Sequence, residues 1–486
     1  MSSSTIRTYR TLSRAALGAA LFALAGCTKD YGVPSGIKGG EEVFQPGCYV
    51  NPNQAAPNDG AAVITLDASQ RFQTMQGFGT SMRLFDDPLV TNSVDPVTKR
   101  GIAIPPASEQ SSILDQLYID LGLTRVRIFP GDGGGIETVN DNGNPLVADL
   151  SKFDFSWTRG DGQIALMPEL VRRGVKTYFS STRALESWMT DSNPDEYAEW
   201  VLVMLHHWRD RGMEMPYVSL KNEPGNAASG GVWSGEFLRD VTKILGARIK
   251  AEGLSTKIVV PDDVSPKEAY ARLQIILADP VARQYVGAIG YHLSERGGED
   301  KIKQLGEQYG IPIWMTEHAT GDDWLDWAKT MHELIADDGV SAIDYRWGFF
   351  GDQSSSQLVQ LVVSGGSYAR SIRMQQYYVM GQYSRFVRPG AVRIGATSSD
   401  PNVKATAYID GTKVIVVASY LPPPELFFER QVRVELGTGG PCVHRADRVR
   451  TSTSDRWLSL GSLTVTAPRF STALPARSVT TFVGQE

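Results

Sequence analysis

The stretch Tyr217-Val218-Ser219-Leu220-Lys221-Asn222-Glu223-Pro224 decides how the sequence is interpreted. Its apolar first half predicts a strand, and the strand ends in a carboxylate. A second segment, Ile313-Trp314-Met315-Thr316-Glu317-His318, has the same design. The sequence therefore predicts two strands that each end in a glutamate.

Both segments belong to a region, residues 73–385, in which short β-branched runs alternate with amphipathic segments. One such segment carries Tyr197, Val201, Leu205 and Trp208, a spacing that gives one apolar helical face. Eight strand–helix units in about 280 residues favour the α/β class and a (β/α)8 TIM barrel over a doubly wound sheet. The candidate strands are Thr74–Gly79, Thr124–Phe129, Val175–Ser181, Tyr217–Lys221, Lys257–Pro261, Val286–His292, Ile311–Thr316 and Ala342–Trp347.

Residues 386–486 have a different texture. After a last helix near Tyr368–Phe386, short strands predict an antiparallel β-sandwich at the side of the barrel. The strand-like segment Ala62–Asp67 precedes the barrel, and we assign residues 49–72 to the same sandwich. The predicted sandwich strands are Val392–Ala396, Ala405–Ile409, Lys413–Ala418, Gln431–Leu436, Ser462–Ala467 and Ser478–Val483.

The N-terminus resembles an export signal. Three arginines precede the uncharged stretch Ala15–Gly26, and Leu24-Ala25-Gly26-Cys27 looks like a bacterial lipobox, which ends residues 1–27 at a cysteine that receives lipid. The alternative is an ordinary cleaved signal in which Cys27 is incidental. Residues 28–48 then form a flexible tether. We expect an exported protein on the periplasmic or cell-surface face, held at a membrane by lipid only.

Composition excludes several classes of function. The 48 basic and 54 acidic residues give a net charge of −6, which argues against nucleic acid as a partner. The six histidines and three cysteines show no metal-ligand spacing, so we expect neither metal nor cofactor. Export leaves Cys48 and Cys442 where disulfides persist, and they can pair if the N-terminal strand joins the sandwich.

The two glutamates are the main candidates for chemistry. Barrel active sites lie at the carboxyl ends of the strands, and strands four and seven lie across the mouth from each other, so Glu223 and Glu317 can face one substrate. Paired carboxylates are what glycosidic cleavage needs. The alternative is structural, with Glu223 capping a helix and Glu317 paired with an arginine.

Other residues fall at the same rim. Arg125 and Arg127 share one face of the second strand, so at least one can reach the mouth and keep a carboxylate ionised. His292 ends the sixth strand and can bond a sugar hydroxyl or a carboxylate. Trp347 ends the eighth and can stack on a sugar, although packing is an equally good reason for an aromatic residue there.

With these residues in place, the chain resembles glycoside hydrolase family 30. The likeness rests on Gln76–Gly79, Asn222–Pro224, Trp314–His318, the long segment Tyr378–Ile394 and the ending Ser478–Val483. It implies a retaining β-glycosidase, with Glu223 as acid/base and Glu317 as nucleophile. It also implies that Asn222 donates to the substrate 2-hydroxyl and that Arg125 holds the nucleophile. The acid role requires a raised pKa for Glu223 in the free enzyme.

Within that family, the motifs look most like those of bacterial glucuronoxylanases, with two departures. The sequence Tyr345-Arg346-Trp347-Gly348-Phe349-Phe350 carries phenylalanines where those enzymes have an arginine pair that grips an acidic branch. Arg183 replaces a sugar-stacking tryptophan after the third strand.

The substrate class therefore stays open at this stage. The favoured substrate is a plant or microbial β-glycan, a polysaccharide or oligosaccharide of the xylan type. The alternatives are β-glucosidase, glucosylceramidase-like, β-1,6-glucanase or galactanase activity. Two alternatives belong to other functional classes: a catalytically silent glycan-binding lipoprotein and a metal-dependent barrel hydrolase.

Overall fold

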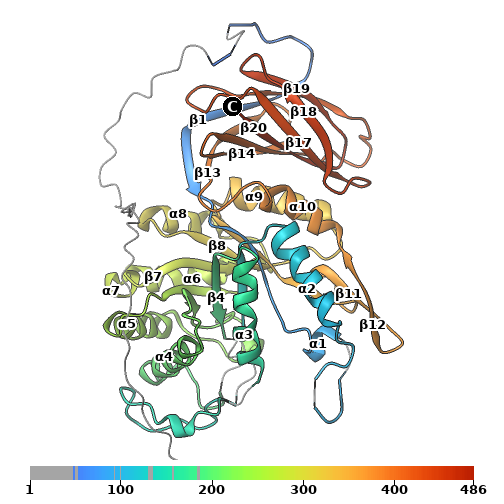
Figure 1. Ribbon diagram of the computed structural model, residues 1–486. Coiled ribbons are helices and arrows are strands. Elements are labelled where there is room, and N and C mark those ends of the chain that lie inside the picture. Colours follow the sequence, from blue (N-terminus) through green and yellow to red (C-terminus); the bar gives the residue numbers. More distant parts are fainter. Residues whose placement is uncertain are drawn as a thin grey trace, which may run out of the picture. The chain divides into compact units, whose positions relative to one another are not determined.

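Eight parallel strands close into a barrel in the computed structural model (Figure 1). The structure describes residues 48–49, 53–91, 94–98, 100–129, 135–155, 158–182 and 186–486. All eight predicted strands are present, which confirms the barrel. They are β2 Gly77–Ser81, β3 Arg125–Ile128, β4 Thr177–Ser181, β5 Tyr217–Ser219, β6 Lys257–Asp263, β7 Val286–His292, β8 Ile313–His318 and β9 Ala342–Tyr345.

Helices follow the strands and bury apolar side chains against the barrel. The predicted face of Tyr197, Val201, Leu205 and Trp208 is buried on α4, which starts with Pro194 at its first position and ends two residues before Gly212, a residue with a φ of 84°. The helices are α1 Pro88–Thr91, α2 Ala107–Asp115 with a π-helical turn at Gln116–Asp120, α3 Thr158–Arg172, α4 Pro194–Asp210, α5 Gly235–Ala251, α6 Pro266–Ala278, α7 Pro280–Arg283, α8 Glu299–Tyr309, α9 Trp324–Ala336 and α10 Gln375–Ser384, with 3-10 turns at Leu150–Lys152 and Ala227–Ser229.

A buried ion pair explains one glycine of the first strand. Gly79 on β2 lies between Arg125 on β3 and Asp344 on β9 in the strand register. A Cβ atom at Gly79 would lie 2.2 Å from Asp344 Oδ1 and 2.5 Å from the Arg125 Cβ. Glycine is therefore required there, because the ion pair between strands β3 and β9 fills the space beside it.

The C-terminal domain is one mostly antiparallel sheet of nine strands, in the order β18-β17-β20-β15-β14-β13-β1-β16-β19. The ring of Phe470 on β19, an edge strand, lies 5.3 Å from that of Phe482 on β20, so the sheet folds over a shared core. These strands are β13 Val392–Ser398, β14 Val403–Asp410, β15 Lys413–Tyr420, β16 Arg430–Glu435, β17 Arg445–Ser452, β18 Leu458–Thr464, β19 Arg469–Leu474 and β20 Ser478–Gln485.

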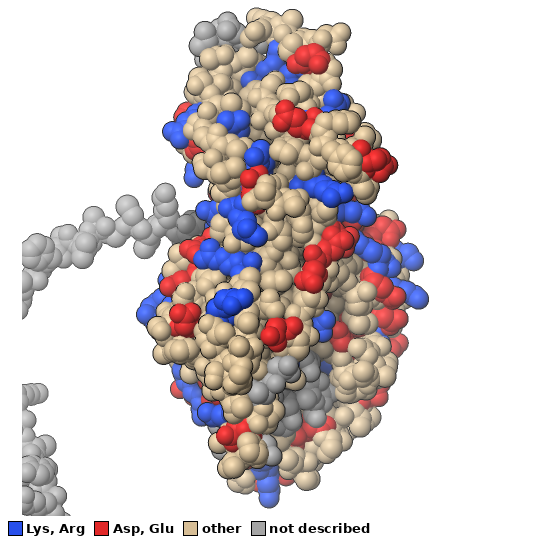
Figure 2. Space-filling model, turned by 90° about the vertical axis from the view of Figure 1, so that its right-hand side faces the viewer, with Lys and Arg blue, Asp and Glu red and all other residues tan. Residues whose placement is uncertain are grey.

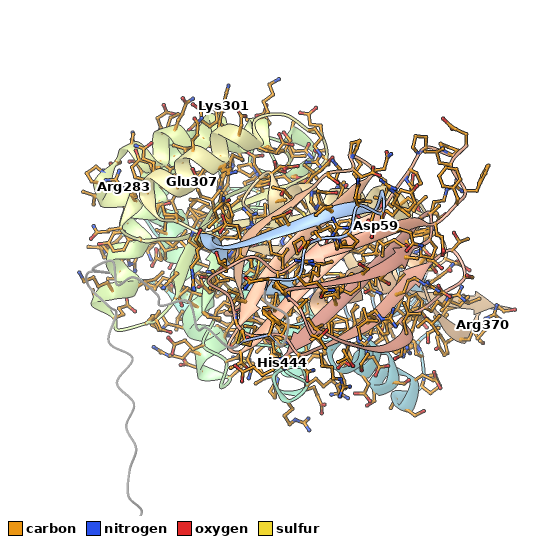
Figure 3. The ribbon with its side chains drawn as sticks, turned by 90° about the horizontal axis from the view of Figure 1, so that it is seen from above. Asp59, Arg283, Lys301, Glu307, Arg370 and His444 are labelled. Carbon is orange, nitrogen blue, oxygen red and sulfur yellow. A yellow bond between two sulfur atoms is a disulfide. The ribbon has the colours of Figure 1, made fainter. Side chains whose placement is uncertain are left out.

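The N-terminal strand β1, Ala62–Thr74, lies inside this sheet, as the view from above shows (Figure 3). It pairs antiparallel with β13 and parallel with β16. Asp59, just before β1, adds an ion pair of 2.9 Å with Arg433 on β16. Both ends of the described chain thus contribute to the sandwich.

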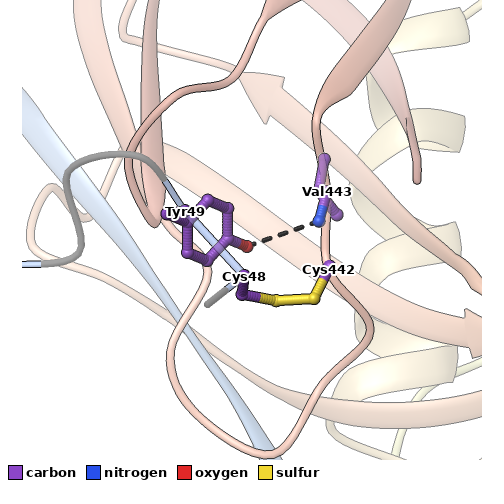
Figure 4. Close-up of a disulfide and its surroundings, with 4 residues drawn as sticks. All are labelled: Cys48, Tyr49, Cys442 and Val443. Carbon is purple, nitrogen blue, oxygen red and sulfur yellow. Dashed lines mark hydrogen bonds between the residues drawn. A yellow bond between two sulfur atoms is a disulfide. The ribbon is translucent and has the colours of Figure 1, made fainter. Parts of the chain in front are cut away.

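A disulfide joins Cys48 to Cys442 (Figure 4). Their Cα atoms are 5.5 Å apart, and 394 positions separate them in sequence. The backbone N–H of Val443 donates to the hydroxyl of Tyr49 at 3.4 Å beside this link. The covalent connection therefore fastens the start of the described chain to the sandwich.

The segment before the sandwich differs from the prediction. The expected helix near Tyr368–Phe386 begins only at Gln375, because Ser367–Arg373 forms β12 and pairs with β11, Gln357–Ser364. Gly365 and Gly366, both with positive φ, form the hairpin turn between them. A third strand, β10 Trp347–Gly351, completes this small sheet, which tertiary pairing rather than sequence pattern determines.

Helix α10 connects the two domains through side-chain hydrogen bonds. The Gln382 amide donates to Thr451 Oγ1 at 2.8 Å and accepts from Thr481 Oγ1 at 2.6 Å, both in the sandwich. Ser384 Oγ donates to the carbonyl of Leu121 in the barrel at 2.5 Å. The long motif Tyr378–Ile394 therefore holds the interface between barrel and sandwich.

The surface in Figure 2 carries acidic and basic side chains interspersed over both domains. Within the described residues, none of the helices has the length and apolar character to cross a membrane. Cys27, Arg183 and nearly all of the proposed tether lie outside the described residues.

Candidate active site

Glu317 lies at the end of β8 and contacts two arginines. Arg127 Nη1 donates to Glu317 Oε2 at 2.7 Å, and Arg346 Nε lies 3.3 Å from Glu317 Oε1. The Arg127 side chain is fully buried, whereas Arg346 is 49% exposed. Both contacts place positive charge against the Glu317 carboxylate.

Arg127 occupies the centre of a buried network. Its second terminal nitrogen, Nη2, donates to Asp262 Oδ2 at 2.9 Å and to Asn222 Oδ1 at 2.6 Å. Burial alone would raise the pKa of Asp262, but the charge of Arg127 and the contact with His292 hold that pKa well below its usual range. Oppositely charged side chains are therefore packed against one another below the mouth of the barrel.

The prediction that Arg125 holds the nucleophile is wrong. Arg125 Nη2 instead bonds Asp344 Oδ2 at 2.9 Å, and its guanidinium lies 4.0 Å from the Trp314 ring centroid. Both arginines point into the barrel, but Arg127 is two residues nearer the carboxyl end of β3. Only the arginine nearer that end reaches Glu317.

Glu223 follows β5 and is held by three side chains. Its Oε2 accepts from Asn226 Nδ2 at 2.8 Å and from Ser229 Oγ at 2.6 Å, and its Oε1 lies 3.0 Å from His292 Nδ1. The backbone of Glu223 has a φ of 53°, and Asp262, whose carbonyl accepts its N–H at 2.9 Å, has a φ of 62°. Left-handed conformations at non-glycine residues cost energy and cluster at functional sites.

The pKa of Glu223 is lowered, whereas the acid role predicted from the sequence required a raised value. Burial would raise this pKa, but the hydrogen bond and charge of His292 lower it to about 2. For His292, burial would lower the pKa, but Glu317 and the other carboxylates around it raise that value to about 9. The resting pair therefore keeps its proton on the imidazole, not on the glutamate.

His292 connects the two glutamates. It pairs with Glu317 in the register of β7 and β8, touches Glu223 through Nδ1, and lies 3.5 Å from Asp262 Oδ1 through Nε2. The His292 side chain is 3% exposed, whereas Glu223 and Glu317 are 18% and 16% exposed. The glutamates are thus the members of the network that solvent reaches.

Two other predicted substrate-binding residues, Asn222 and Trp347, are buried. Asn222 is buried in the network with its oxygen on Arg127. Trp347 begins β10 and is only 6% exposed, with Arg83 over its ring at 4.9 Å and Phe350 stacked at 5.4 Å. That packing corrects the idea of an open sugar-stacking platform, because neighbouring side chains cover the ring.

Sequence reasoning did not select Asp262 or Arg346. Asp262 directly follows the predicted fifth strand, Lys257–Pro261. Residues at the carboxyl end of a barrel strand are candidates for the active site, so this position could have identified it. Arg346 directly follows β9, Ala342–Tyr345, so the same signal applies to it. Phe349 and Phe350, where the arginine pair of the glucuronoxylanases would fall, are buried.

Comparisons with known proteins point to glycoside hydrolases. No protein-family model matches the chain. Putative glucosylceramidase 1 of Caenorhabditis elegans is 25% identical over 415 residues, 74% of this chain and 76% of that protein. Glucuronoxylanase XynC of Bacillus subtilis is 25% identical over 300 residues, 59% of this chain and 65% of that protein. The catalytic domain of a GH30 xylanase C from Talaromyces cellulolyticus has a TM-score of 0.69 at 21% identity and covers 87% of this chain and 100% of that one.

Proposed function

We propose that this chain, a glycoside hydrolase of family 30, hydrolyses a xylan-type β-glycan with retention of anomeric configuration. One observation carries the assignment of roles. The glutamate after β8 is bound by the cationic side chain of Arg127, whereas the glutamate after β5 shares a proton with His292. A nucleophile must be ionised and an acid must command a proton, so the two environments separate the two roles.

The first step forms a glycosyl-enzyme. A Glu317 oxygen attacks the anomeric carbon, the bond to the leaving oxygen breaks, and the Glu223 carboxyl donates a proton to that oxygen. Arg127 holds its positive charge against Glu317 and fixes the orientation of that carboxylate. Because Arg127 engages the Asn222 oxygen, the amide N–H groups remain to meet the sugar 2-hydroxyl that the family resemblance assigns to it.

The proton for this step comes from the pair of Glu223 and His292. In the empty site the imidazole holds it, since the pKa of His292 is raised to about 9 and that of Glu223 is lowered to about 2. A sugar that covers the mouth removes water from the ion pair, and low polarity favours the neutral pair over the charged one. Substrate binding thus moves the proton from Nδ1 to Glu223 Oε1 across 3.0 Å.

The second step releases the sugar. Water attacks the anomeric carbon, Glu223 takes its proton, and the bond to Glu317 breaks. Esterification has removed the negative charge of Glu317, the carboxylate that raises the pKa of His292 most. Without that charge, the pair of Glu223 and His292 binds a proton less tightly. The proton taken from the attacking water still returns this pair to its protonated resting state.

The choice of a xylan-type substrate rests on further observations. It is supported by the similarity to glucuronoxylanase XynC and by the motif at Trp314–His318. The buried Phe349 and Phe350 offer no cationic grip for an acidic branch, which favours unbranched or neutral xylan. The relatives named as a putative glucosylceramidase and an endo-1,6-β-D-glucanase suggest the comparison substrates.

Product analysis tests both parts. The full chain is incubated with neutral and glucuronate-branched xylan, β-1,6-glucan, β-1,6-galactan and aryl β-glycosides, and the first anomer formed is followed by proton NMR. We expect the β anomer before mutarotation, and xylan as the best polymer. An initial α anomer would overturn retention, whereas turnover of β-1,6-glucan alone would overturn only the substrate.

We also propose that Cys27 carries lipid and that the protein acts outside the cytoplasm. The lipobox-like sequence supports this, and the Cys48–Cys442 disulfide agrees with an oxidising compartment. Metabolic labelling with a fatty acid should mark the wild-type chain but not Cys27→Ala, and equal labelling of both would exclude lipid at this cysteine.

A further inference from the structure

Three carboxylates gather at the rim of the barrel, apart from the catalytic network. Asp141 lies in the connection from β3 to α3, and Glu196 and Glu199 lie three residues apart in the first turns of α4. One ligand atom from each lies within 4.8 Å of the others. Two segments that follow neighbouring barrel strands therefore meet at a concentration of negative charge.

Each of the three carboxylates also has one buried oxygen without a hydrogen-bond donor. These atoms are Asp141 Oδ1, Glu196 Oε2 and Glu199 Oε1. Glu199 as a residue is only 2% exposed, so water cannot solvate its orphan oxygen freely. A buried anionic oxygen without a partner is costly, and three of them in one cluster of carboxylates indicate a missing positive charge.

The described basic side chains do not supply that charge. Among the described residues, no ion pair of 4.0 Å or less joins Asp141, Glu196 or Glu199 to a basic side chain. Arg248 weakly favours the ionised Glu199, but its Nη1 donates to the Pro145 carbonyl at 2.6 Å.

The backbone around the cluster is already ordered by other carboxylates. Glu186 accepts the N–H groups of Gly135, Ile136 and Glu137 at 2.7–3.0 Å, and Glu137 Oε1 accepts that of Asp141 at 2.7 Å. The backbone N–H of Asp149 donates to Asp141 Oδ2. Asp141 is therefore held with its other oxygen left over, rather than placed by chance on a loose loop.

We propose that Asp141, Glu196 and Glu199 bind one divalent cation of the Ca²⁺ class. Ca²⁺ takes six to eight oxygen ligands at about 2.3–2.6 Å, so two ligands on opposite sides are about 4.6–5.2 Å apart, which the 4.8 Å limit accommodates. Carbonyl and water oxygens complete such flexible shells, whereas Mg²⁺ demands near-ideal octahedral geometry. The cation ties the β3–α3 connection to the start of α4, beside the mouth but outside the catalytic network.

Calcium binding to the full chain tests this assignment. Chelator-treated protein is titrated calorimetrically with CaCl₂ to about 10 mM, because extracellular Ca²⁺ modules have dissociation constants of about 0.1–1 mM. We expect one site in the wild type and at least tenfold weaker binding in Glu199→Gln. The control Glu333→Gln alters a carboxylate on α9 that Arg296 already pairs at 2.7 Å, and it should bind like the wild type.

Thermal unfolding gives a second readout with a predicted change of sign. With saturating Ca²⁺ the wild type should melt several degrees above Glu199→Gln, since a ligand that binds only the folded state stabilises it. With chelator the variant should melt at the same temperature or higher, because it has lost the repulsion. Asp141→Asn, which changes a loop residue rather than α4, should behave likewise. A wild type that neither binds Ca²⁺ nor gains stability from it overturns the proposal, as does a Glu199→Gln variant with unchanged affinity.

Discussion

Two groups of carboxylates lie at the same end of the barrel and are treated in opposite ways. Around Arg127, the carboxylates of Glu317 and Asp262 each find a cation within 3.0 Å. Around Glu199, three carboxylates converge and leave an oxygen each without a donor. Charge is balanced inside the chain in the first group, whereas in the second it is left for something from outside.

The pKa values separate the two groups in the same way. Burial acts on both, but His292 lowers the pKa of Glu223 to about 2 in the catalytic network. In the acidic cluster, burial raises the pKa of Glu199 to about 7, and its neighbours reinforce the shift. A paired network is pre-organised for chemistry in the empty state, whereas an unpaired one is completed only by a ligand.

The largest effect should follow from the loss of the nucleophile. Glu317→Gln keeps the shape but cannot form the glycosyl-enzyme, so kcat on an aryl β-glycoside should fall by about 10⁴–10⁶-fold. Glu333→Gln, an acid-to-amide change on α9, should leave kcat unchanged. Full turnover by Glu317→Gln would exclude the assigned role, because no other group in the network replaces a covalent nucleophile.

Removal of the positive charge of Arg127 should lower the free energy of unfolding. Arg127→Leu removes the nearer of the two cations beside the buried Asp262 and leaves His292 at 3.5 Å, and removal of one partner from a buried ion pair costs about 3–5 kcal/mol. Chemical denaturation should show this loss, and Arg127→Lys should recover part of it. In the acidic cluster the same kind of change has the opposite sign, since Glu199→Gln in chelator removes repulsion. If both variants destabilised the chain equally in chelator, the contrast between the two groups would disappear.

The sequence allowed the barrel and both glutamates to be predicted, because strand position decides which residues reach the mouth. It did not distinguish Arg125 from Arg127, since both point inward and only depth in the barrel separates them. It also missed β17, where Arg445–Ser452 lacks an apolar alternation and is fixed by pairing with β18 and β20. The acidic cluster was beyond prediction because it joins a loop to a helix about fifty residues apart, with no motif spacing.

A change at His292 should appear in the pH profile. The wild-type pair loses its proton near the His292 pKa of about 9, so kcat/KM should fall as pH rises through that value. In His292→Phe, Glu223 holds the proton alone. Its pKa rises because the lowering effect of His292 is gone, yet it stays below 9, so the alkaline limb should move down by more than about one pH unit.

The matched control for that profile is His206→Gln on α4, a histidine that contacts Glu252 rather than the network. Its alkaline limb should coincide with that of the wild type. An unshifted limb in His292→Phe would mean that the proton resides elsewhere and that the balance of charge around Arg127 does not set the acid.

The smallest effect should come from Arg346, the exposed counterpart of Arg127 on the same carboxylate. Half-exposed ion pairs contribute about 0–1 kcal/mol, so Arg346→Met should lower kcat/KM on a neutral aryl β-glycoside by about fivefold or less. Arg127 still holds Oε2 of Glu317 in that variant, so ionisation of the nucleophile does not depend on Arg346. A loss as large as that in Arg127→Leu would show that balance is set at the surface of the mouth rather than beneath it. In that case the buried network would be a scaffold, and the charge that governs the nucleophile would be one that substrate can displace.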